Sequence, residues 1–467
     1  MKNKILSTLA IILVIVLALT AIACHYVPPT ITNPSTNGST SNNSSIDSPE
    51  PPKSDPIDYM DTMFLVDYLF KNYSIFDVDY ETAMLSAIRT YVSLTGDKYA
   101  MYYTPEELEE MQSENNGDLY GIGVQVIFDY DEHFMEIVLI MPDSPAQGQL
   151  AVGDKVTHIY DGENMVALTA IVEENRAKAK ELYADYTDEE INNVACYETF
   201  QYAVSKLKGP ENTYARFTVD RDGEIIEYNI RRAKVKTVSV TCKTSIRDPK
   251  VGIVQISQFD LTTPVQFKEC MDTLIASGCD KFVFDVRNNP GGDLASVVAV
   301  LSTLLEKGDV IISTKDNNDR NTITTVKEVN YGKEDDYSTC NVTSADIGKY
   351  RGYKYVVLAN ENSASAAELF TAALRDHEIA ELVGVKTYGK GSMQSIYNLA
   401  AQGSSYYGAL KLTTKLYFPP SGEGFNGIGL YPDHTVELEG VAAETHFYKL
   451  TEEIDNQLQK AVSTLID

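Results

Sequence analysis

The sequence predicts a multidomain α/β protein with an N-terminal helical region, a β domain, and a core in which helices cover a largely parallel sheet. Its 467 residues, 43% of them apolar, are too many for one ordinary core, so two or three domains are expected. Residues 57–115 show the three- and four-residue apolar spacing of helices, and residues 236–467 alternate between short apolar strands and helical segments. Strands joined by crossover helices run parallel, so this alternation predicts the parallel sheet.

Residues 1–24 form a candidate export signal or membrane anchor. Met1–Lys4 is a short basic segment, and residues 5–23 are apolar apart from a serine and two threonines. The small residues before Cys24 resemble the lipobox of bacterial lipoproteins, although Ala21 stands where that pattern prefers leucine. An unprocessed apolar run of this length can also remain in the bilayer as an anchor. Both routes predict an extracytoplasmic protein tethered to the bacterial cell membrane.

Composition narrows the possible partners. Residues 25–56 are rich in Pro, Ser, Thr and Asn, and we expect a disordered linker there because they cannot bury enough apolar surface. The net charge of −28 argues against a nucleic-acid partner, which requires clustered Lys and Arg. The cysteines and the six histidines lack metal-ligand spacing, so no metal site is expected.

The helical region, residues 57–115, contains one helix start that can be read directly. A turn at Gly96–Tyr99 separates it from the apolar-periodic segments before it. Thr104 is a good N-cap, and Pro105 suits the first position of a helix. A short helix is therefore expected from Pro105 onward.

The β domain, residues 116–235, opens with a glycine turn that feeds an alternating strand. A second strand at Glu136–Met141 precedes Asp143–Gln147 and Val152–Ile159. The order of these segments resembles a PDZ domain, in which the glycine turn donates N–H groups to the terminal carboxylate of a peptide. The resemblance implies that this turn binds substrate through Leu119, Tyr120, Gly121, Ile122 and Gly123. Between Met165 and Ser205 the helical stretch is longer than the usual PDZ helix and is interpreted as an inserted or extended helix.

The core, residues 236–467, supplies the strands of the expected parallel sheet. The predicted strands are Val251–Ile256, Lys281–Val286, Val310–Ser313, Lys354–Leu358 and Glu381–Val385, with helices at Thr263–Ser277 and Leu294–Leu305. Functional groups in such sheets gather at the carboxyl ends of the strands. Two polar segments follow strands in this way, Arg287–Gly292 and Asn362–Glu368.

A serine and a lysine stand out as candidate reactive groups. Ser365 begins a predicted helix, and Lys390 lies in the glycine turn Tyr388–Gly391, with an apolar helix and a short strand between them. A serine beside a lysine held neutral in a poorly solvated pocket is a nucleophile with its own general base. Burial is the largest effect that lowers the pKa of a lysine toward neutrality.

Several ordered motifs resemble those of the carboxyl-terminal processing peptidases of family S41. The motifs are Ile256–Phe259, Phe284–Gly292, Ser363–Glu368, Gly389–Gln394, and a tail comprising Thr413–Tyr417, Pro420–Gly422 and Gly429–Asp433. With the helical region and the PDZ-like domain, the resemblance extends from about residue 57 to residue 467.

The resemblance implies a catalytic set without a metal or a cofactor. Ser365 is the expected nucleophile, Lys390 the general base, and Gln394 the residue that fixes the lysine by a hydrogen bond. The oxyanion is expected at the backbone N–H groups of Gly291 and Ala366, because glycine permits close approach and a first-turn amide is unpaired. The expected protein is a serine endopeptidase that cleaves exported proteins and recognises their C-termini through the PDZ domain.

The sequence also allows two hypotheses from other functional classes. A non-catalytic PDZ protein would bind or scaffold peptides at the cell surface, and only an assay separates it from the peptidase. A nucleotide-binding protein is suggested by Gly384–Lys390, which is similar to a Walker A sequence, but Gly391 replaces the Ser or Thr that would bind Mg²⁺. Protein or peptide substrates and the membrane are the expected partners, and a homo-oligomer remains possible.

Overall fold

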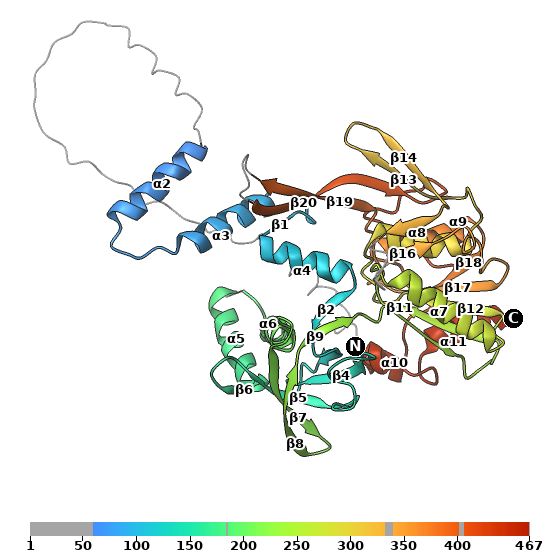
Figure 1. The fold of residues 1–467 in the computed structure, drawn as a ribbon, viewed down its shortest axis with the longest axis horizontal. Helices are drawn as coiled ribbons and strands as arrows, with labels where there is room; N and C mark the ends of the chain where they lie inside the picture. The colour runs from blue at the N-terminus through green and yellow to red at the C-terminus, as the bar shows by residue number, and fades with distance from the viewer. Residues whose placement is uncertain (1–58, 184, 332–339, 401–405, 467) are drawn as a thin grey trace, which may run out of the picture. The chain divides into compact units, whose positions relative to one another are not determined.

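The computed structural model describes residues 59–183, 185–331, 340–400 and 406–466 (Figure 1). The chain divides into two compact units, residues 1–102 and 103–467. The leader expected at residues 1–24 and the linker expected at residues 25–56 lie outside the described residues. Within the described residues, no helix combines the length and the apolar character needed to cross a bilayer.

The first unit contains helices α2 (Tyr59–Tyr73) and α3 (Tyr80–Ser93). Asp79 caps α3 by accepting the Thr82 N–H at 3.1 Å. Helix α4 (Pro105–Asn115) belongs to the second unit, and its start is the expected one. The Glu107 N–H donates to Thr104 Oγ1 at 3.3 Å and the Thr104 N–H donates to Glu107 Oε2 at 3.0 Å, a reciprocal capping box.

The β domain is an antiparallel sheet with two helices. Its strand order is β3-β4-β5-β7-β8, with β6 paired to β5, and a separate pair joins β2 to β9. The strands are β2 (Asp118–Gly121), β3 (Val124–Phe128), β4 (Met135–Ile140), β5 (Lys155–Tyr160), β6 (Met165–Ala167), β7 (Tyr214–Arg221), β8 (Glu224–Arg231) and β9 (Ala233–Lys236). Strand β3 lies at one edge of the larger sheet.

The long helical stretch of this domain is two helices, α5 (Leu168–Leu182) and α6 (Asp188–Leu207). A new helix begins at Asp188 because Thr187 and Glu190 form a capping box. Buried residues of both helices, including Val172, Ala195 and Ala203, share one hydrophobic core with the sheet.

The core sheet has the strand order β10-β11-β12-β17-β18-β21. Its strands are β10 (Val240–Thr244), β11 (Val251–Ile256), β12 (Lys281–Asp285), β17 (Lys354–Ala359), β18 (Ala380–Gly384) and β21 (His434–Thr435). Every neighbouring pair from β11 to β21 is parallel, and β10 is antiparallel to β11. The carboxyl ends of the parallel strands therefore meet at one edge of the sheet.

Helices cover both faces of this sheet (Figure 1). Helices α7 (Thr263–Ala276), α8 (Leu294–Leu304) and α9 (Ala366–Asp376) pack with Phe284 and the other side chains of one face. Helix α11 (Asn456–Ile466) packs on the opposite face against alternate residues such as Val283. Successive side chains of a strand point to opposite faces of the sheet, so neighbouring residues such as Val283 and Phe284 belong to different hydrophobic clusters.

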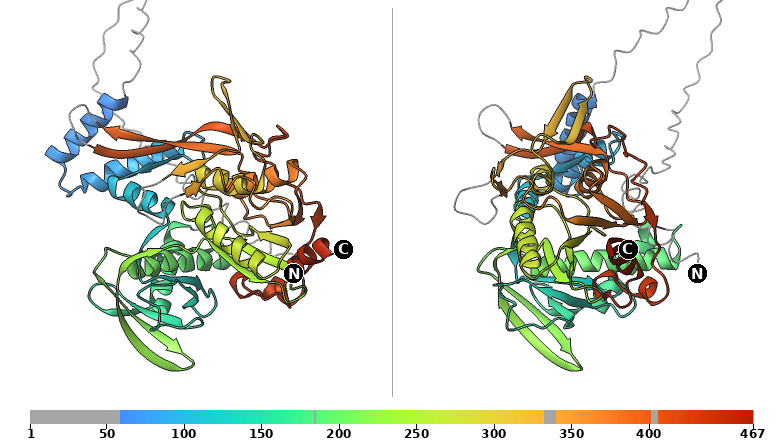
Figure 2. Two further views of the ribbon diagram at one scale, coloured as in Figure 1. Left: turned by 45° about the vertical axis from the view of Figure 1, so that its right-hand side comes forward. Right: turned by 90° about the vertical axis from the view of Figure 1, so that its right-hand side faces the viewer.

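A second, antiparallel sheet contains β13 (Val310–Asp316), β14 (Asn321–Thr325), β19 (Ser392–Ala400) and β20 (Tyr406–Phe418) (Figure 2). The strand expected at Val310–Ser313 forms, but it does not join the parallel sheet. Ser313 pairs with Phe418 of β20 instead. The remaining short elements are β1 (Met101–Tyr103), β15 (Val329–Tyr331), β16 (Cys340–Val342), α10 (Val441–Glu444) and the 3₁₀ turn η1 (Phe447–Lys449).

Candidate active site

The candidate site begins where two neighbouring parallel strands end. Asp285, the last residue of β12, pairs with Leu358 near the end of β17. The segments that follow, residues 286–292 and 360–365, therefore emerge side by side. We call residues 286–292 the oxyanion turn, after the role predicted for Gly291.

Hydrogen bonds hold these two segments together. The Asn288 N–H donates to Asn360 Oδ1 at 2.8 Å, and Asn360 Nδ2 donates to Asn288 Oδ1 at 2.9 Å. Fully buried Ser363 donates its hydroxyl to the Val286 carbonyl at 2.8 Å. The Ala364 N–H donates to the Asn289 carbonyl at 2.9 Å. The position of the oxyanion turn is thus fixed relative to the residues just before Ser365.

Ser365, the predicted nucleophile, is the N-cap residue of α9 and is half-buried. Its backbone dihedrals, φ 55° and ψ −115°, are rare for a residue with a side chain. Such conformations cost about 1–3 kcal/mol and persist only where the surroundings impose them. The surroundings here include Gly291, where a Cβ atom would lie 2.7 Å from Ser365 Cβ and 2.9 Å from the Ala366 nitrogen. The structure therefore brings the three predicted residues Gly291, Ser365 and Ala366 into contact.

The two amides predicted to hold the oxyanion differ in their hydrogen bonding. Ala366 is the first residue of α9, a position where backbone N–H groups have no acceptor within the helix. The Gly291 N–H, in contrast, donates to Asn289 Oδ1 at 2.8 Å, an Asx turn closed by a fully buried asparagine. The Gly291 amide is therefore already engaged in this structure.

A buried carboxylate links the predicted nucleophile to the predicted base. Glu368 Oε2 accepts the Ser365 N–H at 3.0 Å and the Lys390 N–H at 2.7 Å. Glu368 Oε1 accepts the Thr387 hydroxyl at 2.6 Å and the Gly389 N–H at 2.7 Å. The residue has no exposed surface. Burial raises the pKa of Glu368, and the four donors oppose that rise.

Lys390 lies in the turn between β18 and β19 and is half-buried. Tyr417 donates its hydroxyl to the Lys390 carbonyl at 2.5 Å. Gln394 lies in β19, where its Nε2 atom donates to Ser392 Oγ and Thr413 Oγ1, both at 3.1 Å. These contacts fix the Gln394 side chain, and its hydrogen bond to Lys390 stays a prediction.

The residues that sequence reasoning missed are those that hold this arrangement together. Glu368 is the clearest, and Asn289 and Asn360 act in the same way on the neighbouring segments. A signal for Glu368 was present, because Ser365 and Glu368 have the spacing of a capping box. No comparable signal marks the asparagines, whose partners are distant in the sequence.

The same contacts argue against the nucleotide-binding hypothesis. A phosphate-binding loop aims its backbone N–H groups at the phosphates. Here the amides of Gly389 and Lys390 donate to the Glu368 carboxylate, which would repel a phosphate. Across the described parts of the chain, no group of three or more His, Cys, Asp or Glu side chains is arranged to hold a metal ion.

The residues predicted to bind a peptide C-terminus lie in the β domain. Leu119, Tyr120 and Gly121 belong to β2, and Gly123, with φ 80°, turns the chain into β3. A cavity of about 540 Å³ adjoins this segment, and Leu119, Tyr120 and Val204 of α6 are among its lining residues. Ile122 is buried, and its carbonyl accepts the Ala146 N–H at 2.9 Å.

Comparison with known proteins agrees with the geometry. Residues 250–436 match Peptidase family S41. The chain is 28% identical over 352 residues to a "Probable CtpA-like serine protease" of Staphylococcus aureus (strain N315), covering 75% of this chain and 60% of that protein. It is 27% identical over 350 residues to a "Carboxy-terminal-processing protease" of Bartonella bacilliformis, and this match covers 74% of this chain and 67% of that protein. The chain thus spans about 60% of the length of the S. aureus relative.

Solved structures are also similar to this chain. The Photosystem II D1 C-terminal processing protease matches with a TM-score of 0.42 and 19% identity, covering 82% of this chain and 89% of that one. A putative S41 protease from Bacteroides fragilis NCTC 9343 matches with a TM-score of 0.49 and 13% identity, and the match covers 89% of this chain and 99% of that chain. The matched segment 250–436 contains Gly291, Ser365, Lys390 and Gln394. The similarity to peptidase family S41 therefore covers the segment that holds the candidate site.

Proposed function

We propose that this protein is a serine endopeptidase in which Ser365 is the nucleophile and Lys390 the general base. The observation that carries the proposal is the Glu368 carboxylate, one oxygen of which accepts the backbone N–H groups of both residues. The helix that bears the serine and the turn that bears the lysine are thereby joined through a single buried atom. The names of the relatives, a serine protease and a carboxy-terminal-processing protease, support the same reaction class.

The reaction follows from these roles. Neutral Lys390 accepts the Ser365 hydroxyl proton while Oγ attacks the peptide carbonyl, and the lysine then protonates the departing amine to leave an acyl-enzyme. Lys390 then deprotonates a water molecule that attacks the ester carbonyl, the bond between the acyl carbon and Ser365 Oγ breaks, and the lysine returns the proton to Oγ as the acid leaves. The developing oxyanion is held by the Ala366 N–H and by the Gly291 N–H, whose hydrogen is then shared with Asn289.

The β domain is proposed to act as a PDZ domain that captures the C-terminus of the substrate. Its strand β3 lies at a sheet edge, where an extended peptide can add a strand. Partly buried side chains of β3 and α6, including Val126 and Val204, pack on the same core and would line the groove. The substrates are proposed to be exported proteins, and the enzyme to act outside the cytoplasm, tethered to the membrane by its N-terminal segment.

The test uses the full chain in detergent and an unfolded polypeptide with a free apolar C-terminus, at neutral pH without ATP or added metal. Wild type is expected to cleave it, and Ser365→Ala is expected not to. An amidated C-terminus should raise KM and leave kcat unchanged. Cleavage by both proteins would assign the nucleophile elsewhere. Binding of the free C-terminus without cleavage by wild type would favour the peptide-binding, non-catalytic alternative.

A further inference from the structure

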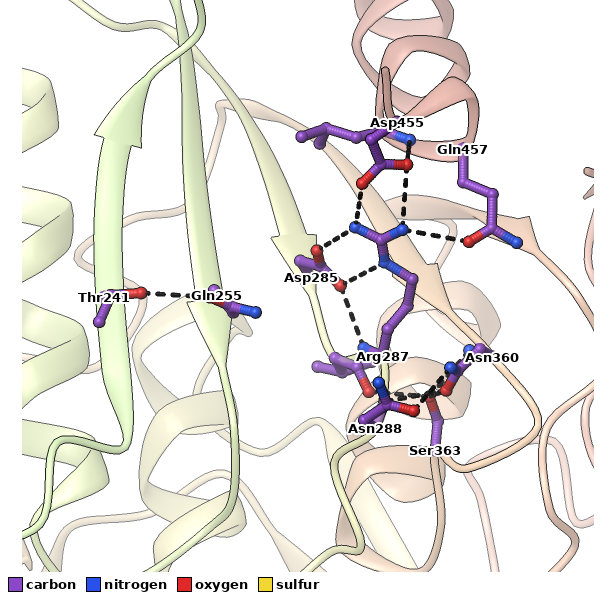
Figure 3. A network of polar contacts seen from close by, with 11 residues as sticks. Thr241, Gln255, Asp285, Arg287, Asn288, Asn360, Ser363, Asp455 and Gln457 are labelled. Carbon is purple, nitrogen blue, oxygen red and sulfur yellow. Dashed lines mark hydrogen bonds and ion pairs between the residues drawn. The ribbon is translucent and has the colours of Figure 1, made fainter. Parts of the chain in front are cut away.

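A buried arginine lies at the start of the oxyanion turn and is held by the C-terminal part of the chain. Arg287 is 4% exposed and lies two residues after the end of β12. Its Nε and Nη2 atoms donate to the two oxygens of Asp285 at 3.0 and 2.7 Å. Its Nη1 and Nη2 atoms donate to the two oxygens of Asp455 at 3.1 and 2.7 Å (Figure 3).

Other residues of the C-terminal segment enclose the same guanidinium. Gln457 Oε1 accepts from Arg287 Nη1 at 3.1 Å, and Gln457 Nε2 donates to the Val436 carbonyl at 2.7 Å. The ring of Phe447 lies 5.1 Å from Arg287 Cζ, within the range of a cation–π contact. We call Arg287, Asp455 and Gln457 the C-terminal clamp.

The charge balance shows why Asp455 is needed. Burial lowers the pKa of Arg287, but Asp285 and Asp455 outweigh this and hold the pKa above its usual value. A bidentate pair fixes direction as well as distance, since the planar guanidinium meets both oxygens at once. Losing one partner of a buried pair leaves a charge that the protein must compensate by moving the arginine or admitting water.

The clamp connects directly to the proposed catalytic atoms. Arg287 is followed by Asn288, which is bonded to Asn360, and by Asn289, which accepts the Ala364 N–H and closes the Asx turn on Gly291. Figure 3 shows Asn288 next to Arg287, with Asn360 and Ser363 of the neighbouring segment beside it, below the carboxylates. A displacement of Arg287 is therefore passed along Asn288 and Asn289 to Gly291, the residue of the turn that lies against Ser365.

We infer that Asp455, together with Gln457, is a positioning residue for catalysis. Through Arg287 it holds the oxyanion turn in the position in which its N–H groups can bind the tetrahedral intermediate. The inference rests on the proposed peptidase function. The side chains of Asp455 and Gln457 bind Arg287, the Leu458 N–H and the Val436 carbonyl, so we expect them to affect the transition state through the oxyanion turn and to leave substrate binding unchanged.

The variant that isolates this role is Asp455→Asn. Asp455 Oδ1 also accepts the Leu458 N–H at 2.9 Å and so caps α11. Asparagine is an equally good N-cap, so the helix start is retained while the charge on Arg287 loses one partner. The matched control is Glu452→Gln, because Glu452 is 2% exposed, lies in the same segment, and binds Ser245 and the Ile246 N–H away from Arg287.

The experiment measures kcat and KM, the inhibition constant of a peptide boronic acid, and amide hydrogen exchange in residues 286–292, using the full chain. For Asp455→Asn we expect kcat to fall by about tenfold or more, a part of the 10²–10³-fold loss that follows removal of an oxyanion donor. The boronate, which mimics the tetrahedral intermediate, should bind more weakly by a similar factor. KM should stay within about twofold, and exchange in residues 286–292 should accelerate. Glu452→Gln should lower the melting temperature and leave all four quantities unchanged.

The outcomes separate the inference from the function on which it rests. If wild type cleaves and Ser365→Ala does not, the peptidase function stands. The proposed role of the clamp would then be overturned by unchanged kcat and hydrogen exchange in Asp455→Asn, or by an equal loss of kcat in Glu452→Gln. A wild type that does not cleave, or a Ser365→Ala variant that does, would overturn the peptidase function and the clamp together.

Discussion

Ser365 occupies a strained backbone conformation that the fold must hold in place. Its φ of 55° and ψ of −115° would relax if the contact with Gly291 or the hydrogen bond to Glu368 were lost. Gly291 itself has φ 103°, and a side chain there would meet the Ala364 carbonyl oxygen at 2.8 Å. At the scale of single residues, close backbone contacts therefore hold the two side chains that are proposed to react.

Lys390 gives the first prediction at this scale. Lys390→Ala should lower kcat/KM by about 10²–10⁴-fold, the usual contribution of a general base. Lys390→Arg should fail as well, because a guanidinium does not deprotonate in this pH range. Mass spectrometry measures the formation of the acyl-enzyme, and the melting temperature checks that the variant is folded. Full turnover by Lys390→Ala would remove the lysine from the mechanism.

Glu368 gives a prediction about pH. Burial raises its pKa above the usual 4.5, so the folded protein binds a proton at a pH where the unfolded chain has lost it. The contribution of Glu368 to stability is therefore greatest at low pH and is lost as pH rises through its folded pKa. Activity should change in the opposite direction, because a protonated carboxyl accepts fewer of the four hydrogen bonds.

The measurement compares urea unfolding and kcat between pH 4 and pH 7 for wild type and Glu368→Gln. The glutamine resembles the protonated acid, so this variant should be less active than wild type at neutral pH. The changes in stability and kcat that protonation of Glu368 causes as pH falls should be absent from the variant. Identical pH profiles for the two proteins would contradict the assignment.

At the scale of elements, the predicted serine and lysine come from different sheets. Ser365 follows β17 of the parallel sheet, and Lys390 leads into β19 of the antiparallel sheet. The sequence was sufficient to predict the helix after Ser365 and the strands at Val251–Ile256 and Lys354–Leu358, because their apolar patterns are local. It was insufficient for the partner of β13, since the pattern of Val310–Ser313 is equally suited to either sheet.

The candidate site also has parts that the sequence could predict and parts that it could not. Ser365, Ala366 and Gly291 could be named from the motifs, and the structure brings them into contact. The hydrogen bonds from Asn288 to Asn360 and from Arg287 to Asp455 join residues 72 and 168 positions apart. Contacts at such separations follow from the sheet topology and leave no periodic trace in the sequence.

The β domain offers a stability prediction at this scale. Asp154 is buried, and both its oxygens contact Arg221 of β7, at 2.6 and 2.7 Å. Arg221→Ala should lower the free energy of unfolding by about 2 kcal/mol, less than the 3–5 kcal/mol of a fully buried pair because Arg221 is partly exposed. The control is Arg216→Ala on the same strand, whose pair with Glu227 is exposed, and which should cost under about 1 kcal/mol.

The pH dependence of this difference has a defined sign. Burial raises the pKa of Asp154, but Arg221 and the Ala151 N–H outweigh it and leave the pKa below its usual 3.8. The stability that the pair provides is therefore present above that value and is lost as pH falls through the folded pKa. Urea unfolding at pH 7 and pH 3 should show wild type and Arg221→Ala converging in acid. A gap of constant size would assign the effect to packing of the arginine stem.

At the scale of the whole molecule, charge and the N-terminal segment set the expected location. A net charge of −28 keeps the folded part soluble, while residues 1–24 are apolar with a basic start. Wild type should therefore fractionate with membranes, and a protein whose residues 1–24 are replaced by a cleavable signal peptide should be released after export. Retention of that protein on membranes would place the attachment elsewhere in the chain. Cys24→Ala separates the two routes, because only a lipoprotein needs that thiol.

The position of Asp455 along the chain has a consequence for biosynthesis. A polypeptide leaves the ribosome N-terminus first, so Arg287, Ser365 and Lys390 all emerge before Asp455, the residue that completes the clamp. Until helix α11 docks, the newly made chain holds Ser365 and Lys390 but an oxyanion turn without its support. We therefore expect a chain in which helix α11 has not yet docked to cleave neighbouring proteins slowly.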